Sequence, residues 1–334
     1  MAVHPGATPF HHPDWARLVA RCYGFRAFAV ATTDVTGGSG ITIRAGLPVV
    51  EVRHLRYGRP KWVSLPYTDY CPPLVSAGQQ EERLVAALEQ ASQAAGVRQV
   101  EVRAPLAGTA GTGRRSLRHL LALDGGPARV HAGFHRSQVQ RSIRRAEREE
   151  LTVRGAAGSQ DLTDTFYRLH LRTRRRQGVP VQPRRFFRQL WEAAIDPGLG
   201  SVLIVEAAGR PIAGGVFLAW NETVIYKFGA SDPSAWSLRP NHLLFWHAIR
   251  TACEQGYRWF DFGRTDVEQE GLRQFKLSWG AIEEPLVYQT LGAGKPGLVP
   301  LTDGMGTRML RPVIRHSPLL VCRGVGEALY RYVA

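Results

Sequence analysis

The 334-residue chain contains only four cysteines and no long apolar run. Its four cysteines lie far apart and form no C-x-x-C pair, which argues against a zinc site or a disulfide framework and suits a reducing cytoplasm. No apolar run approaches the ~18 residues that a membrane-spanning helix requires. Residues 1–15 lack the apolar core of a signal peptide. We therefore expect a cytoplasmic protein that works without a metal ion or a prosthetic group.

Lysine is also scarce, although the chain is strongly basic. The 43 Lys and Arg residues outnumber the 28 Asp and Glu residues, and the formal net charge is +15. This charge predicts attraction to polyanions such as nucleic acid, anionic lipid or phosphorylated metabolites. The arginine bias is typical of a GC-rich coding sequence. A lysine in such a chain can mark a place that requires a mobile primary ammonium, because the two cations are not interchangeable. The lysines are Lys61, Lys227, Lys276 and Lys295.

The length and the apolar fraction of 44% favour two packed domains. A pattern of hairpin, Asp-containing loop, helix, glycine and strand occurs twice, from Gly46 to Arg103 and from Gly209 to Arg264. The Gly-rich loop at 107–115 contains no phosphate-binding P-loop motif. We predict an N-terminal domain at 1–150, a C-terminal domain at 151–300 that carries the transfer site, and a helical extension at 301–334.

The second copy of the pattern predicts a definite order of elements. Strands are expected at 201–207, 211–219 and 223–229, followed by a helix capped by Asn241, a strand at 257–262, a helix at 269–279 and a strand at 284–291. Helices are expected before it at 134–149, 161–175 and 183–194. This order resembles the GNAT acyltransferase fold. The predicted fold class is α/β (α+β), with two tandem GNAT-like domains, each a mixed, largely antiparallel sheet flanked by helices.

Short motifs in a fixed order make the chain resemble the Fem family of peptidoglycan-bridge aminoacyltransferases, within the GNAT-like superfamily. In the first half they are HPDW at 12–15 and LPYTDYCPP at 65–73. The middle of the chain carries RSIRRAE at 141–147 and RRRQGVP at 174–180, followed by Phe186 and Phe187. The last motifs are YKFGAS at 226–231, FDFG at 260–263 and GLRQFK at 271–276.

The resemblance implies two GNAT-like domains with a substrate channel between them. It implies transfer of an amino acid from aminoacyl-tRNA, as co-substrate, to an amine on a peptidoglycan precursor. The family's Phe-Lys pair matches Phe275 and Lys276, and this lysine is taken to stabilise charge at the attacked carbonyl. The aspartate of the family's Leu-Pro loop matches Asp69 and would lie near the acceptor. The long helical arm of several family members has no counterpart here, and an acceptor from a natural-product pathway is the alternative.

Aminolysis of an activated ester asks little of a protein, because the amine must only be neutral, aimed at the carbonyl and matched by an oxyanion partner. Lys276 is the best oxyanion partner by residue type. Asp69, flanked by Tyr67 and Tyr70, is expected to bind the acceptor ammonium or accept its proton. The competing interpretations are a surface lysine and a turn aspartate. The substrate-binding candidates in the second domain are Tyr226, Ser231, Asp232, Arg239, Asp261 and Arg264, of which Asp232 is more simply a turn former and Asp261 and Arg264 are equally well explained by pairing with each other.

Two arginine-rich segments, 136–148 and 172–188, predict contact with a phosphate backbone, although such runs are also typical of solvated helix faces. The residues expected to bind tRNA are Arg141, Arg144, Arg145, Arg174, Arg175 and Arg176.

Three further alternatives remain open from the sequence. An acyl-CoA donor is disfavoured because 234–241, where the pyrophosphate would bind, has no glycine and contains a proline, which lacks an N–H donor. An RNA-binding protein without catalysis would leave Phe275 and Lys276 unexplained. The stretch 305–331 mixes apolar and basic residues, for which packing onto the second domain is preferred over peripheral contact with an anionic membrane. The oligomeric state is left open.

Overall fold

The computed structural model describes residues 4–36, 40–53, 60–76, 79–106, 116–292 and 305–332, so the predicted loop at 107–115 lies outside the described residues. The chain forms two compact units. The first comprises residues 1–116, 285–304 and 331–334, and the second comprises 117–284 and 305–330. This grouping differs from the predicted ranges, since 117–150 belong to the second unit. The reason is that the strand beginning at Ser116 joins the second sheet and the basic helix packs into the second core.

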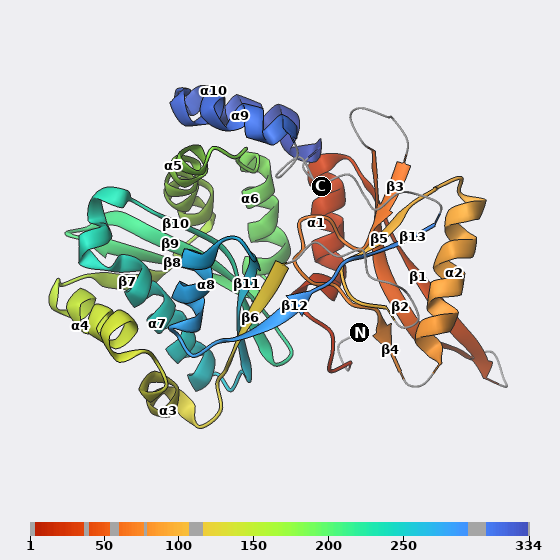
Figure 1. Cartoon of the computed structure of the whole chain (residues 1–334), viewed down its shortest axis with the longest axis horizontal. Helices are drawn as coiled ribbons and strands as arrows, with labels where there is room; N and C mark the ends of the chain where they lie inside the picture. The colour runs from red at the N-terminus through yellow and green to blue at the C-terminus, as the bar shows by residue number, and fades with distance from the viewer. Residues whose placement is uncertain are drawn as a thin grey trace. The chain divides into compact units, whose positions relative to one another are not determined.

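The first unit is built on a six-stranded sheet with the order β1-β2-β3-β5-β13, in which β4 also pairs with β2. Helices α1 and α2 lie on opposite sides of this sheet (Figure 1). Its core gathers alternate residues of β2, such as Leu47 and Val49, against Leu84 and Leu88 of α2. The elements are η1 (Pro9–His11), α1 (Pro13–Tyr23), β1 (Arg26–Thr36), β2 (Gly40–Arg53), β3 (Pro60–Val63), β4 (Leu74–Val75), α2 (Gln80–Ala94), β5 (Val100–Val102) and β13 (Gln289–Leu291).

The second unit is built on a seven-stranded sheet with the order β12-β6-β11-β10-β9-β8-β7. Its strands are β6 (Ser116–Ala122), β7 (Thr152–Gly155), β8 (Gly200–Ala207), β9 (Arg210–Trp220), β10 (Thr223–Ser231), β11 (Trp259–Asp266) and β12 (Ile282–Leu286). Its helices are α3 (Gly126–Ala132), η2 (Arg136–Gln140), α4 (Arg141–Arg148), η3 (Asp161–Phe166), α5 (Tyr167–Gln177), α6 (Arg184–Leu190), η4 (Trp191–Ile195), η5 (Pro233–Leu238), α7 (Pro240–Glu254), α8 (Glu270–Leu277), α9 (Met305–His316), α10 (Leu319–Leu329) and η6 (Tyr330–Tyr332).

Two faces of this sheet are covered by different helices. On one face, α7 packs with Phe217, Phe260 and Phe262 into a core that also contains Ile143 and Ala146 of α4. On the other face, α5 contacts β9 and β10 (Figure 1). The apolar residues of the arginine-rich helix expected at 134–149 are therefore buried, as their helical spacing predicts.

Most of the predicted elements are present, and two details differ. Arg239, not Asn241, precedes the first residue of α7, because Pro240 begins the helix and Asn241 instead donates from Nδ2 to Ser231 Oγ (3.3 Å). The predicted strand 284–291 is two strands, since β12 ends at Leu286 in the second sheet and β13 pairs with β5 of the first sheet.

The C-terminal helices α9 and α10 contact α5, on which they lie in Figure 1. Ile314 and Cys322 are buried there. Packing onto the second unit is thus confirmed. None of the helices within the described residues has the length and apolar character needed to cross a membrane.

Candidate active site

Strands β10 and β11 run parallel for only a short distance and then lose their pairing. Thr223–Ile225 pair with Trp259–Asp261, whereas β10 continues to Ser231 and β11 to Asp266. A register shift between β9 and β10 at Tyr226 accompanies the divergence. Gly263 lies just beyond the last pair with a φ of 74°, a left-handed conformation that favours glycine. Beyond this point, the backbone groups of β11 that no longer pair with β10 need hydrogen-bond partners from side chains.

Lys276 supplies one of these side chains. It lies in the last turn of α8 and is only 5% exposed. Its Nζ donates to the carbonyl oxygens of Gly263 (2.8 Å) and Arg264 (3.3 Å). A buried ammonium is costly unless it has such acceptors. The structure thus fixes a positive charge beside the diverging strands, and the interpretation of Lys276 as a surface residue is wrong.

A second set of charged side chains lies on the same side of the sheet as Lys276. His119 Nε2 of β6 is 3.0 Å from Glu283 Oε1 of β12, and Arg273 binds both oxygens of Glu283 at 2.9 Å. Burial and the charge of Lys276 lower the pKa of His119 against the opposing effect of Glu283. The hydrogen bond from Arg273 lowers the pKa of Glu283. At neutral pH the imidazole is therefore neutral and the carboxylate ionised.

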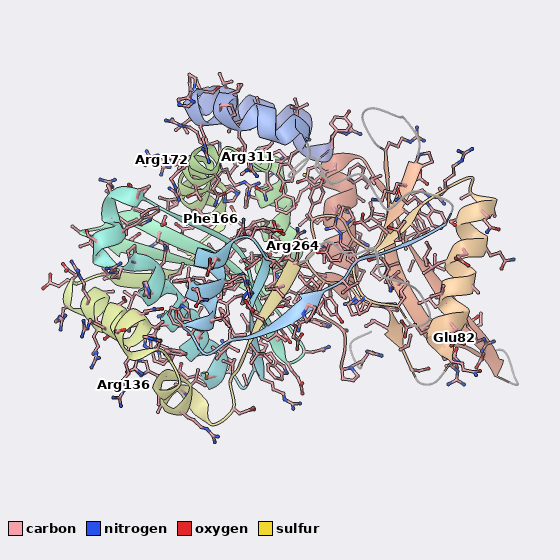
Figure 2. The ribbon with its side chains drawn as sticks, viewed as in Figure 1. Glu82, Arg136, Phe166, Arg172, Arg264 and Arg311 are labelled. Carbon is pink, nitrogen blue, oxygen red and sulfur yellow. The ribbon has the colours of Figure 1, made fainter. Side chains whose placement is uncertain are left out.

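Asp261 and Arg264 have partners that the sequence did not predict. Asp261 is buried in β11, accepts from the N–H of Gly263 (2.7 Å) and lies 3.2 Å from Arg118 Nε of β6. Arg264, labelled in Figure 2, binds Asp266 at 2.6 Å. Because successive side chains of a strand alternate, Arg118 and Asp261 occupy the face opposite to His119. Asp261 thus stabilises the backbone at Gly263, and the carbonyl of Gly263 accepts from Lys276 Nζ.

Phe275 and Tyr226 lie in the aromatic core of the second unit. Phe275 contacts His242 (5.5 Å between ring centroids) and Phe245 (5.8 Å), which holds α8 in place. Tyr226 packs on Phe217 and Phe245, and burial raises the pKa of its hydroxyl. The expectation that Tyr226 binds substrate finds no support here, because Tyr226 shares the strand face of Val224, which belongs to the second core.

The remaining candidates of this unit lie around the start of η5. Ser231 is buried and its Oγ accepts from Trp236 Nε1 (2.9 Å). Asp232 accepts from the N–H and hydroxyl of Ser234 and pairs with Arg210 (2.7 Å), and the bonds to Ser234 lower its pKa. Asp232 is thus a helix cap, as its simpler interpretation predicts. Arg239 is exposed at the head of α7, with a φ of 62°.

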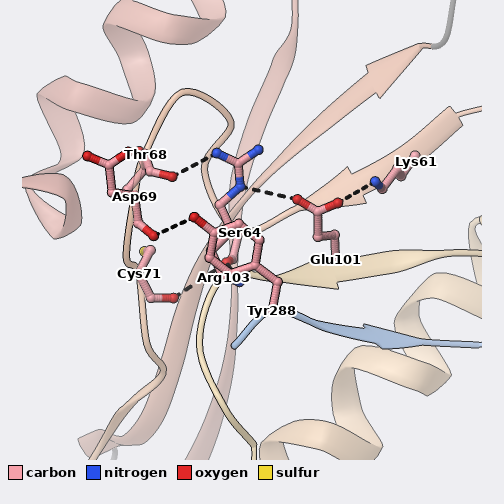
Figure 3. A network of polar contacts seen from close by, with 8 residues as sticks. All are labelled: Lys61, Ser64, Thr68, Asp69, Cys71, Glu101, Arg103 and Tyr288. Atoms are coloured by element: carbon pink, nitrogen blue, oxygen red, sulfur yellow. Dashed lines mark hydrogen bonds and ion pairs between the residues drawn. The ribbon is translucent and has the colours of Figure 1, made fainter. Parts of the chain in front are cut away.

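The first unit carries the other predicted site in a strained loop after β3. Leu65 and Tyr67 both have left-handed backbones, with φ of 59° and 62°. Such conformations cost non-glycine residues about 1–3 kcal/mol each and concentrate at functional sites. Tyr67 stacks on Tyr23 at 4.7 Å, and Tyr70 packs beside the first core. Figure 3 shows the Asp69 carboxylate pointing away from Glu101, while its carbonyl accepts from Tyr288 (2.7 Å).

A buried ion-pair network holds this loop. Arg103 donates from Nη1 to the carbonyl of Thr68 (2.7 Å) and from Nε to Glu101 (3.2 Å), and Lys61 binds the other oxygen of Glu101 at 2.6 Å (Figure 3). Ser64 Oγ accepts from the N–H of Arg103 (2.8 Å). Burial raises the pKa of Glu101, but the charges of Arg103 and Lys61 outweigh it and lower the pKa to about 2.

Residues 133–277 match the family described as acetyltransferase (GNAT) domain. This range lies within the second unit. The matched range includes β11, α8 and Lys276, and it supports acyl transfer as the class of reaction. No curated protein matches the chain significantly.

Solved structures extend the likeness beyond the GNAT domain. FemX is 14% identical with a TM-score of 0.69, over 87% of this chain and 94% of FemX. The C-terminal domain of a putative lysylphosphatidylglycerol synthetase from Agrobacterium fabrum is 14% identical, with a TM-score of 0.54 over 88% of this chain and 90% of that one. L-PGS from Bacillus licheniformis is 14% identical, with a TM-score of 0.51 over 80% and 86%. The resemblance to Fem-like GNAT proteins is thus confirmed at the level of the fold.

Sequence reasoning missed the residues around Lys276 that come from strands. His119 and Glu283 belong to β6 and β12, two short strands whose pairing joins residues more than 160 positions apart. Nothing in their local pattern indicates this pairing. The repeated pattern that ends at Arg264 marks β11, and β6 lies beside β11 in the sheet. This pattern was therefore the one signal in the sequence that pointed to the position of these residues.

The six arginines expected to bind tRNA divide into two groups within the second unit. Arg141, Arg144 and Arg145 are exposed on α4. The other three, on α5, are more constrained. Arg174 donates to the carbonyl of Pro180 (3.0 Å), and burial lowers its pKa. Arg175 is half-buried and Arg176 lies over the ring of Trp236 at 4.9 Å.

The pKa of His119 offers a test of the geometry around Lys276. We expect its imidazole to titrate below the ordinary midpoint of 6.5. Lys276→Met should raise this midpoint, because a neighbouring positive charge is removed, and Glu283→Gln should lower it, because a negative charge is removed. Histidine ¹³Cε1 shifts followed by NMR measure both changes, with the exposed His135 as internal control. The arrangement would be contradicted if the two variants moved the His119 midpoint in the same direction, or if neither variant moved it.

Proposed function

We propose that the chain forms amide bonds by transferring an amino acid from aminoacyl-tRNA to an amine, preferentially one on a peptidoglycan precursor. The observation that carries the proposal is the buried ammonium of Lys276, held by two carbonyls of β11 where β10 and β11 diverge. A GNAT domain on a FemX-like fold supports this class of chemistry.

In the proposed reaction the amine nitrogen bonds to the ester carbonyl carbon of the aminoacyl group. The carbonyl oxygen gains negative charge, which the fixed charge of Lys276 stabilises. The bond from the carbonyl carbon to the ribose oxygen then breaks. The amine loses a proton and the ribose oxygen gains one, so the products are an amide and uncharged tRNA. The reaction needs no metal ion and no covalent enzyme intermediate.

Asp69 is proposed to bind the acceptor ammonium before transfer. Its loop is held in a strained conformation by Arg103 and Tyr288, which bind the carbonyls of Thr68 and Asp69. These bonds use backbone atoms of the loop and leave the Asp69 carboxylate unused by them. A carboxylate suits a cationic amine.

An acyl-CoA donor is the second candidate, which the acetyltransferase description favours. The head of α7, where a pyrophosphate would need backbone N–H donors, argues against it. The N–H groups of His242 and Leu243 both donate to the carbonyl of Arg239, at 3.1 and 3.4 Å. The N–H of Ser234 donates to Asp232 (3.0 Å), and Pro240 has none.

The donor is decided by comparing charged tRNA with acetyl-CoA. With bulk aminoacyl-tRNA carrying labelled amino acids, we expect label to enter an amine acceptor and RNase treatment to abolish the transfer. Acetyl-CoA should give no product above the background without enzyme. Acceptor arms should include a peptidoglycan-precursor peptide, an amine-bearing peptide metabolite and phosphatidylglycerol, because one similar structure bears the name of a putative lysylphosphatidylglycerol synthetase. Product from acetyl-CoA that resists RNase would contradict the proposal.

A further inference from the structure

A cavity lined mainly by arginines lies in the second unit, away from β10 and β11. It has a volume of about 480 Å³, and three elements form its wall: η3, α6 and α10. The lining residues are Ser159, Thr163, Arg184, Arg185, Arg188, Arg323 and Glu327.

The charges around the cavity do not balance. Arg184 pairs with Asp164 and donates to the carbonyl of Thr163 (2.9 Å), and Arg185 pairs with Glu327 at 2.9 Å. Within the described ranges, neither Arg188 nor Arg323 forms an ion pair. Four guanidinium groups thus face two carboxylates, and two positive charges remain for a ligand.

Exposed apolar side chains adjoin this cavity on α10. Leu320, Arg323 and Glu327 are spaced three and four residues apart, so they form one stripe of the helix. Leu320 is 80% exposed, Val321 is 47% exposed, and Val313 of the neighbouring α9 is 55% exposed. The opposite side of the two helices α9 and α10 carries Ile314 and Cys322, which are buried. The outward face therefore combines apolar residues with uncompensated arginines.

We propose that this face docks on a membrane that contains anionic phospholipid, and that the cavity binds a lipid phosphate. Arginine suits this role, because its planar guanidinium binds phosphate oxygens in pairs and is weakly hydrated. The hydroxyls of Ser159 and Thr163 add hydrogen-bonding groups at the wall. Leu320 and Val321 enter the interfacial region, as apolar residues of amphipathic helices do. A polyribonucleotide would use the arginines but gains nothing from Leu320, and on this ground we favour the membrane.

Vesicle co-sedimentation of the full chain tests the proposal. We expect binding to vesicles of phosphatidylcholine with about one third phosphatidylglycerol, little binding to pure phosphatidylcholine, and weakening as salt rises. Arg188→Gln with Arg323→Gln should weaken binding more than tenfold, since each arginine near an anionic surface contributes about fivefold. Leu320→Gln should weaken it several-fold. Glu327→Gln, which removes a negative charge from the cavity, should strengthen it.

Matched controls lie elsewhere on the same unit. Arg250→Gln with Arg258→Gln removes two exposed arginines, and Leu272→Gln removes an exposed leucine; both should leave vesicle binding within twofold. Equal binding to both vesicle types, or no loss with the Arg188 and Arg323 pair, would overturn the proposal. The proposal would also be overturned if the variant with Arg188→Gln and Arg323→Gln bound a tRNA-like hairpin more weakly while its vesicle binding stayed unchanged. The readout does not depend on the donor of the transfer reaction.

Discussion

Lys276→Met is expected to lower the rate of amide formation by about 10²–10³-fold while the protein stays folded. Losing one preorganised group that stabilises an oxyanion typically has an effect of this size. Methionine nearly matches the lysine in length, but it carries no charge. The KM for the donor should change little, because the charge acts on the transition state and not on the bound ground state.

The variant also leaves the carbonyls of Gly263 and Arg264 without their bonds to Nζ, at a cost of about 1–3 kcal/mol in unfolding free energy. Rates should therefore be measured well below the melting temperature, which circular dichroism provides. Lys227→Met is the matched control, since Lys227 belongs to β10 of the same unit and lies over the ring of Phe228 at 5.7 Å. It should retain turnover within twofold. Full turnover by folded Lys276→Met protein would remove Lys276 from the mechanism.

Glu101→Gln is expected to destabilise the first unit by about 3 kcal/mol at pH 7. The carboxylate has a folded pKa of about 2 against an ordinary value of 4.5, and the interaction that causes this difference is lost in the amide. Arg103 and Lys61 would then remain charged without their carboxylate, which is what makes breaking a buried pair costly. Arg103 would no longer be held against Thr68, so amide exchange should rise in the loop that carries Asp69.

The sign of the pH dependence follows from the lowered pKa. The contribution of Glu101 is fully present above pH 4.5 and is lost as pH falls toward 2. The stability difference between native protein and Glu101→Gln should therefore shrink as pH is lowered from 5 to 3. Urea unfolding with hydrogen exchange of the β3 and β5 amides measures it. Glu82→Gln, an exposed glutamate of α2 labelled in Figure 2, should change stability by less than about 0.5 kcal/mol at any of these pH values. A pH-independent difference would refute the assignment.

Local patterns predicted most of the second unit. The strands at 201–207, 211–219 and 223–229 and the helix after Pro240 follow from apolar alternation, turn residues and helix spacing, all of which act over short stretches. The place of Lys276 at the end of a short helix also followed from the sequence. Its burial did not, because the two carbonyls that hold it come from a strand whose pairing with β10 ends at Asp261.

Contacts between distant segments account for what the sequence could not predict. Tyr226 alternates with apolar neighbours, and only its packing against Phe217 of β9 and Phe245 of α7 shows that its ring faces the core. Asp261 and Arg264 lie three residues apart, yet Arg118 and Asp266 are the partners that the fold gives them. Likewise, the arginines at 174 and 175 read as a free basic run, whereas α9 and α10 pack on α5 and restrict them.

The division of the predicted strand 284–291 into β12 and β13 has a consequence for how such proteins can be recombined. The first unit takes its edge strand and Tyr288 from residues encoded long after its other strands. A gene fragment that stops at residue 116 would specify a sheet without that strand and an Asp69 loop without the hydroxyl that binds it. A chimera that exchanges the first unit with a relative must therefore transplant more than one piece of coding sequence, and a crossover at a single point should be poorly tolerated.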